Sequence, residues 1–191
     1  MITAHGRLSF TRRVRHTDNP PAARPHVMTA RTAVAYVWAA ARLALGWVFL
    51  WAFLDKMFGL GHETRVAQAW VNGGSPTEGF LAHGAAGPFA GFYHVIAGAA
   101  WADWLFMIGL LGIGLALVLG IGMRIAAVAG ALLLVMMWAV VLPPEHNLCM
   151  DDHLIYALLI VGLALTGAGD AIGLGRWWTN TALVRRLPIL R

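Results

Sequence analysis

Residues 103–142 read DWLFMIGLLGIGLALVLGIGMRIAAVAGALLLVMMWAVVL, and this stretch decides the fold class. Asp103 and Arg124 are its only charged residues, and Arg124 lies in a short glycine-containing turn between two apolar runs. Each run is close to the roughly 20 residues that an α-helix needs to cross a bilayer core about 30 Å thick. Neither run alternates as a barrel strand would. The stretch therefore predicts an antiparallel pair of membrane-spanning helices, 103–121 and 125–142.

Two further apolar runs flank this pair, at 32–54 and at 154–169. The chain of 191 residues is 59% hydrophobic and only 12% charged, whereas soluble domains carry roughly 25% charged residues. Folded in water, such a chain would expose large apolar patches. We therefore expect an all-α integral membrane protein, namely a bundle of four transmembrane helices. Its long connection at 61–101 is expected to form short interfacial helices in the outer loop between the first two spans.

Basic residues are distributed unevenly between the two sides of the predicted bundle. The side that carries both chain ends holds 11 of the 14 lysines and arginines. Cytoplasmic loops of membrane proteins carry such an excess, so both ends are expected in the cytoplasm. Residues 1–31 then form a disordered basic tail, 32–178 the membrane domain and 179–191 a second cytoplasmic tail. Lipid at the membrane surface accounts for these charges, and no nucleic-acid partner is expected.

Arg42 lies about ten residues into the first predicted span, which places it near the middle of the bilayer. A charge there costs about 2.5–3.5 kcal/mol, so the side chain should face the bundle interior or water. Lys56 follows fourteen residues later, and at about 100° per residue the two cations lie about 40° apart on one helix face. Two interpretations stay open for Arg42. It serves an anion or quinone pocket, or it is a structural arginine bonded to carbonyls of neighbouring helices.

A polar cluster precedes the fourth predicted span. It comprises Asn147, Asp151, Asp152 and His153, with Tyr156 one helical turn further on. A carboxylate beside a histidine can exchange protons with a quinone at the outer interface. An aspartate at this position can equally cap the helix and do nothing more. His94 and Asp103 border the outer loop and are expected to line the same pocket.

Other kinds of site find little support in the sequence. Cys149 is the only cysteine, which excludes an intrachain disulfide and a cysteine-ligated iron–sulfur cluster. The eight histidines show neither HxxxH nor HExxH spacing. A Walker loop and a GxGxxG fingerprint are both missing. We therefore predict no bound metal and no bound flavin.

Three segments carry a likeness to a known family: FLWAFLDK at 49–56, WVNGGSPTEGFL at 70–81, and Asn147 followed by the run 151–153. Together they resemble the DoxX/DoxD-like membrane proteins, and most closely the large, DoxD-like subunit of thiosulfate:quinone oxidoreductase. The resemblance covers about residues 35–178, and the segment at 70–81 is its most specific part. Leu148 departs from the family pattern, which has proline after the asparagine.

The resemblance implies an activity in a bacterial plasma membrane. Two thiosulfate ions would be oxidised to tetrathionate, and their electrons would pass to membrane quinone as a diffusible acceptor. It also implies a second small subunit or a homo-oligomer. Thiosulfate is a dianion, and Arg42, Lys56 and Arg65 are the basic side chains on the outer or buried side. Aromatic residues of the first span, together with Trp70, would wall an apolar slot for the quinone.

We therefore expect a membrane subunit of a quinone-linked oxidoreductase. Proton exchange is assigned to Asp152, His153 and Tyr156. Substrate or quinone binding is assigned to Arg42, Lys56, Trp70, His94, Asp103, Asn147 and Asp151. Two alternatives stay open: a non-catalytic membrane subunit that anchors or matures a redox partner, and a small transporter.

Overall fold

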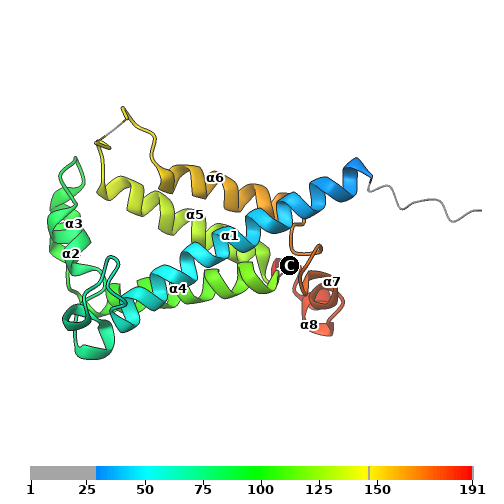
Figure 1. The fold of residues 1–191 in the computed structure, drawn as a ribbon, viewed down its shortest axis with the longest axis horizontal. Coiled ribbons are helices and arrows are strands. Elements are labelled where there is room, and N and C mark those ends of the chain that lie inside the picture. The colour runs from blue at the N-terminus through cyan, green and yellow to red at the C-terminus, as the bar shows by residue number, and fades with distance from the viewer. Residues whose placement is uncertain (1–28, 146, 191) are drawn as a thin grey trace, which may run out of the picture.

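The computed structural model describes residues 29–145 and 147–190, and the regular structure in this part of the chain is helical throughout (Figure 1). Its four longest helices are α1 (Ala30–Phe58), α4 (Ala100–Leu119), α5 (Met123–Val140) and α6 (Asp152–Leu165). Of these, α1, α4 and α5 are long and apolar enough to cross a membrane. The all-α class is thus confirmed, with three apolar helices that could span a membrane. The fourth predicted span is α6, whose 14 residues fall short of the roughly 20 that a straight crossing needs.

Glycines and side-chain caps set the helix ends. The Thr29 side chain accepts from the backbone N–H of Thr32, so α1 begins slightly before the predicted residue 32. Gly59, with φ of 65°, ends α1 in the left-handed conformation that glycine adopts most easily. Gly120 and Gly122 also have positive φ, and they make the tight turn between α4 and α5. This turn produces the antiparallel pair that the sequence predicts.

The long helices pack in the order α1, α4, α5, α6, and α1 and α6 meet each other far less. Their shared core includes Phe49, Met107, Leu117, Leu134 and Ile160. Glycines bring the helices close. A Cβ atom added at Gly114 would lie 2.7 Å from the Leu50 side chain on α1, and one added at Gly130 would lie 2.5 Å from Ile160 on α6. Close approach of this kind stabilises helix packing in lipid.

The connection between α1 and α4 lies across one end of the bundle (Figure 1). It contains the 3₁₀ turns η1 (Val66–Gln68) and η2 (Trp70–Asn72) and the short helices α2 (Glu78–His83) and α3 (Ala90–Ile96). The connection thus contains short helices, as predicted. Tyr93 fastens α3 to the bundle, because its buried hydroxyl donates to the Met136 carbonyl of α5 at 3.0 Å. Burial raises the pKa of this hydroxyl, which keeps it protonated as a donor.

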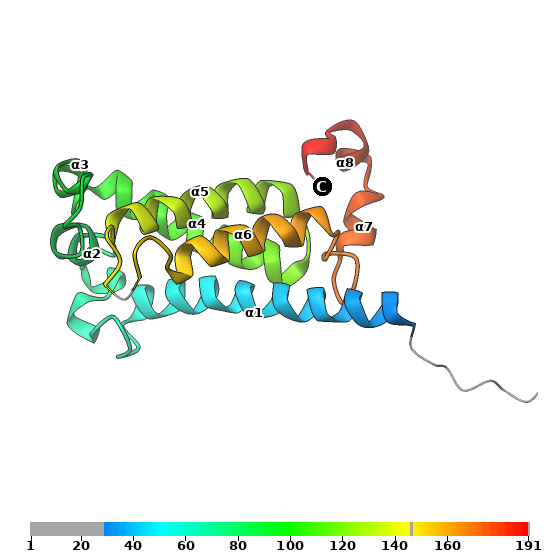
Figure 2. The same ribbon diagram turned by 90° about the horizontal axis from the view of Figure 1, so that it is seen from above.

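The opposite end carries α7 (Gly175–Thr179), α8 (Ala182–Arg186) and η3 (Pro188–Leu190), as Figure 2 shows. Residues 179–190 were expected to be a tail, but they fold back on the bundle. The Trp178 ring donates to the Leu190 carbonyl at 2.6 Å, and Arg124 of α5 donates to the Pro188 carbonyl at 3.1 Å. Val184 is buried. Of the predicted basic tail at 1–31, residues 1–28 lie outside the described residues, and Thr29 to Arg31 form the cap and start of α1.

The start of α1 and the helices α7 and α8 lie at one end of the bundle, and the long connection lies at the other (Figures 1 and 2). We call these the inner and outer ends, after the predicted orientation. Cys149 lies in the loop between α5 and α6, at the outer end.

Labelling of Cys149 tests this orientation. The thiol is exposed, so a membrane-impermeant maleimide should label it in intact cells. In a Cys149→Ser background, Ala182→Cys at the inner end should be labelled only after the cells are permeabilised. The reverse pattern would place the chain ends outside and would overturn the predicted orientation.

Candidate functional site

Arg42 is fully buried, and its guanidinium group binds five backbone carbonyls. The acceptors are the carbonyl oxygens of Leu117 and Val118 at the end of α4 and of Ala168, Ala171 and Ile172 after α6. The Nε atom lies 3.1 Å from Ala168 O, and Nη2 lies 2.6 Å from Ile172 O. An arginine has five N–H donors, and this set of acceptors engages all of them. Arg42 therefore ties α1 to α4 and to the α6–α7 connection.

Arg42 is expected about halfway along the first predicted span, but in the structure it does not lie halfway along the bundle. The residue lies level with the last turn of α4, because α1 extends past the inner end of α4 over residues 30–41. With its donors engaged by carbonyls, the guanidinium group has none left for an anion or a quinone. The structural interpretation accounts for Arg42, and we remove it from the candidate ligand site. Lys56, at the other end of α1, has no part in this network.

Asp55 and Lys56 differ in their roles at the outer end of α1. Asp55 is buried, and its carboxylate accepts the backbone N–H groups of three successive residues, 62–64, at 3.3, 3.1 and 2.8 Å. It fixes the start of the long connection. Lys56 Nζ lies 3.6 Å from the carboxylate of Glu63, which is 84% exposed. An ion pair with so exposed a partner contributes little, so Lys56 keeps its capacity to bind an anion.

Asp103 fastens the GGSPTEGFL segment to α4 rather than lining a pocket. One oxygen of its buried carboxylate accepts from the Ser75 hydroxyl at 2.8 Å, and from the Thr77 hydroxyl and backbone N–H at 2.6 and 3.1 Å. The Ser75 oxygen in turn accepts the N–H of Glu78 at 3.1 Å, which ties this turn to the start of α2. The most specific part of the family resemblance is thus a structural turn.

Trp70 and His94 lie in the outer connection. The Trp70 ring meets Trp104 of α4 edge-on, with centroids 4.7 Å apart, and packs against the main core. The His94 ring lies 3.1 Å from the Ala85 carbonyl, between α2 and α3. This contact of His94 therefore lies within the outer connection.

Asp151 and His153 form the closest pair of titratable side chains at the outer end of α6. Asp151 caps the helix, since its Oδ1 accepts the N–H of Leu154 at 3.1 Å. Its Oδ2 lies 2.7 Å from Nδ1 of His153, and the two side chains are only 12% and 19% exposed. Asp152 is 67% exposed and lies 3.4 Å from the same nitrogen. The expected pairing of Asp152 with His153 is therefore corrected: Asp151 is the main partner.

The neighbouring residues shape the loop before α6. The Asn147 side chain accepts the backbone N–H groups of Cys149 and Met150 at 3.4 and 3.5 Å, and the Trp138 ring donates to the Cys149 carbonyl at 2.7 Å. These contacts hold the chain as it enters the Asp151 cap. Asn147 is thus a turn residue in this structure.

The carboxylates of Asp151 and Asp152 and the ring of His153 bring potential metal-binding atoms within 4.8 Å of one another. The sequence analysis predicts no metal here. Both oxygens of Asp151 are engaged, one by the helix N-terminus and one by the imidazole. The cluster is therefore explained without an ion, and we assign no metal site to it.

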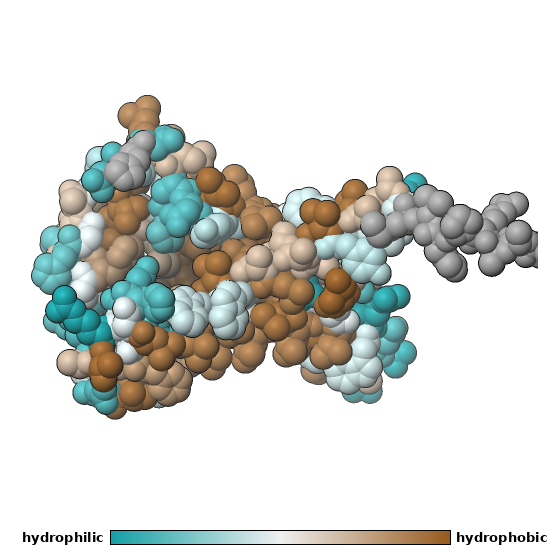
Figure 3. Space-filling view, viewed as in Figure 1, coloured by the Kyte–Doolittle hydropathy of each residue, from teal (hydrophilic) through white to brown (hydrophobic). Residues whose placement is uncertain are grey.

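An apolar opening lies between α1 and α6 toward the outer end. Trp38 of α1 approaches α6 near the inner end, where a Cβ atom added at Gly162 would lie 4.0 Å from its ring. In the view of Figure 1 the two ribbons separate toward the outer end. Tyr156 on α6 and Phe53 on α1 both pack against the core as partly buried side chains. In Figure 3 this region is recessed and largely hydrophobic, and hydrophilic side chains border it at the outer end.

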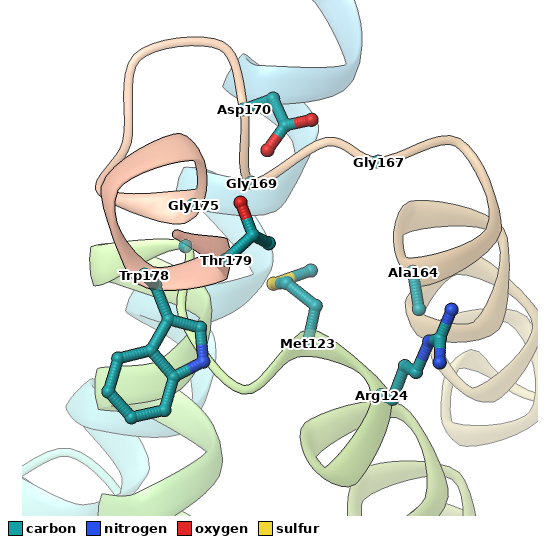
Figure 4. Close-up of a pocket in the computed structure, with 10 residues that line it drawn as sticks. Met123, Arg124, Ala164, Gly167, Gly169, Asp170, Gly175, Trp178 and Thr179 are labelled. Atoms are coloured by element: carbon teal, nitrogen blue, oxygen red, sulfur yellow. The ribbon is translucent and has the colours of Figure 1, made fainter. Parts of the chain in front are cut away.

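Two cavities of the described part of the chain lie at the inner end, and no predicted site residue lines either. One has a volume of about 290 Å³ and lies between the α4–α5 turn and α7, with Arg124, Asp170 and Trp178 on its wall (Figure 4). The other, of about 730 Å³, separates the start of α1 from the α6–α7 connection. Asp170 belongs to the glycine-rich run GAGDAIGLGR at 167–176, a signal that the sequence analysis passed over.

Comparison of the chain with known protein families, curated proteins and solved structures gave no match. The likeness to DoxX/DoxD-like proteins therefore rests on the motifs alone, and function is argued below from the geometry.

Replacement of Arg42 tests its structural role. In Arg42→Met, five carbonyls lose their donor, and each buried unsatisfied group costs about 1–3 kcal/mol. We expect a loss of stability of about 3 kcal/mol or more, measured as a lower thermal unfolding midpoint in detergent. Arg65→Met, at an exposed site, should leave the midpoint unchanged. Wild-type stability combined with lost ligand binding would restore the ligand interpretation.

Replacement of Asp103 tests the anchor of the outer connection. Asp103→Asn replaces the charged acceptor of three hydrogen bonds with a neutral amide. Hydrogen bonds to charged groups contribute about 1.5–3 kcal/mol each, so all three should weaken. We expect faster amide hydrogen exchange in residues 75–83 while α4 keeps its protection. Glu63→Gln, which removes an exposed carboxylate in the same connection, is the matched control. Equal exchange in the Asp103 variant and wild type would show that the anchor is dispensable.

Proposed function

We propose that this protein is the membrane-embedded subunit of a quinone-linked oxidoreductase that reduces membrane quinone at the outer end of the bundle. The observation that carries the proposal is the partly buried Asp151–His153 pair at the outer start of α6, one of the two helices that border the apolar opening of Figure 3. A quinone needs an apolar slot and a proton donor at its head group. The opening supplies the first, and the protonated, imidazolium form of His153 supplies the second.

The Asp151–His153 geometry suits proton transfer. The carboxylate holds Nδ1 of the ring, so the tautomer is fixed and the other ring nitrogen is left to face a ligand. Histidine side chains exchange protons near neutral pH. Asp152 is mostly exposed and lies further from the ring than Asp151 does, so the proposed proton transfer does not depend on it. Tyr156 follows one turn below and would contact the quinone ring.

We propose thiosulfate as the electron donor, in line with the motif resemblance. Two thiosulfate ions each lose one electron and join through a new S–S bond to give tetrathionate. Quinone takes up the two electrons and two protons to give quinol. With Arg42 removed from the site, Lys56 and Arg65 at the outer end supply the positive charge for the dianion.

A second candidate, a membrane subunit that anchors or matures a redox partner, is favoured by one observation. Large hydrophobic side chains are exposed at the outer end on α3 and on the loop before α6: Phe89, Phe92, Val95 and Leu148. Exposed apolar patches mark sites of protein or membrane contact. A partner subunit seated there would lie close to the Asp151–His153 pair.

Thiosulfate-dependent quinone reduction by the purified protein, alone and with its native neighbours, tests the proposal. Asp151→Asn keeps a good helix cap but removes the charge that holds the ring. We expect it to lower turnover about 10²-fold or more, the range of general acid–base effects, with unchanged thermal stability. His153→Gln should behave in the same way.

Asp152→Asn is the matched control, because it changes a neighbouring carboxylate that is mostly exposed. It should retain most of the wild-type rate. If Asp151→Asn and His153→Gln keep wild-type rates across pH 5–8, the site assignment is wrong. If the wild-type protein binds a soluble redox partner but reduces no quinone with it, the anchoring function is correct instead.

A further inference from the structure

The inner end of the bundle holds a groove that the proposed function does not use. Residues 30–41 of α1 extend about 18 Å beyond the end of α4, at 1.5 Å per residue. Between this extension and the α6–α7 connection lies the cavity of about 730 Å³. Arg31, Tyr36 and Trp38 line it from α1, Asp170 and Ile172 line it from the connection, and Arg176 lines it from the first turn of α7.

The charges of the groove favour an anion. Arg31 and Arg176 lie on its two walls, and both are exposed. Within 29–145 and 147–190, neither arginine has a carboxylate within ion-pair distance. Asp170 is the one carboxylate among the described lining residues. Guanidinium groups bind phosphate through paired N–H donors, so two of them in one groove are suited to a phosphate group.

The surroundings of the groove favour a lipid as the source of that phosphate. Apolar side chains beside it are exposed, including Val34 and Val37 on α1 and Leu165 at the end of α6. Tyr36 and Trp38 are of the types that gather at membrane–water interfaces. The groove thus combines arginines, interfacial aromatics and an adjoining apolar surface. Basic pockets between membrane helices on the cytoplasmic side bind anionic head groups.

We propose that this groove binds an anionic phospholipid of the leaflet at the inner end. Its phosphate contacts Arg31 and Arg176, and its acyl chains lie on the exposed apolar surfaces of α1 and α6. The bound lipid bridges the extension of α1 and the α6–α7 connection, two segments that Arg42 already joins deeper in the bundle. The inference depends on α1 crossing the membrane, and it is independent of the quinone chemistry.

Native mass spectrometry of the full chain in detergent, with phosphatidylglycerol or phosphatidylcholine added, tests the inference. The wild-type protein should retain phosphatidylglycerol in preference to phosphatidylcholine. In the double variant Arg31→Gln/Arg176→Gln, that preference should fall roughly tenfold or more, because each basic residue contributes measurably to binding of an anionic surface. Arg185→Gln/Arg186→Gln removes two exposed arginines of α8 that do not line the groove, and it should keep the preference.

Three results would overturn the proposal: no preference in the wild type, equal losses in both double variants, or displacement of the lipid by excess inorganic phosphate, which would identify a free-phosphate site. The lipid-free thermal midpoint of Arg31→Gln/Arg176→Gln should equal that of the wild type, since both residues are exposed. Arg31→Lys/Arg176→Lys should recover part of the preference, because it restores charge without the paired donors.

Discussion

The buried guanidinium group of Arg42 is the interaction on which the inner half of the structure depends. The last carbonyls of a helix have no partner within it, and the irregular chain after α6 presents several more. Arg42 satisfies both sets, so one side chain joins α1, α4 and the α6–α7 connection. Glycine makes room for it: a Cβ atom at Gly120 would lie 3.2 Å from its Nη1. Ile172 is held at a φ of 50°, a strained value for a β-branched residue, and its carbonyl accepts from Arg42.

Aspartates at the outer end accept backbone N–H groups that would otherwise lack a partner. Asp55 accepts three of them at the start of the long connection, Asp103 accepts from the turn at 75–77, and Asp151 accepts from the first turn of α6. Polar residues inside an apolar bundle are thus mostly explained by the backbone. Asp151 differs from the other two, because its second oxygen holds a titratable ring. This second contact distinguishes Asp151, a candidate site residue, from Asp55 and Asp103, which anchor the chain.

The sequence predicted the helices well because long apolar runs between glycines leave few alternatives, as in α4 and α5. It predicted the depth of Arg42 poorly, because the register between α1 and α4 depends on contacts such as Gly114 with Leu50, which hydropathy does not encode. Asp151 and Asp152 are adjacent and equally good caps, so only the path of the chain decides which one meets His153. The fold of residues 179–190 depends on single contacts, such as Trp178 with Leu190, that leave no periodic signal.

The line along which α1 and α6 face each other, here called the seam, links the Arg42 network at the inner end to the apolar opening at the outer end. At its inner end Trp38 approaches Gly162 and the Arg42 network joins the helices, whereas toward its outer end the surface is recessed and largely hydrophobic (Figure 3). A flat apolar molecule dissolved in the bilayer could enter such a seam sideways from the lipid, without crossing an aqueous boundary. The closed inner end would limit how far this molecule moves inward. Its polar head group would then lie toward the outer end, where the Asp151–His153 pair is. A seam that could open along its whole length would hold a ligand at no fixed depth. Because Arg42 joins the helices at the inner end, the proposed ligand would have a defined depth in the outer opening.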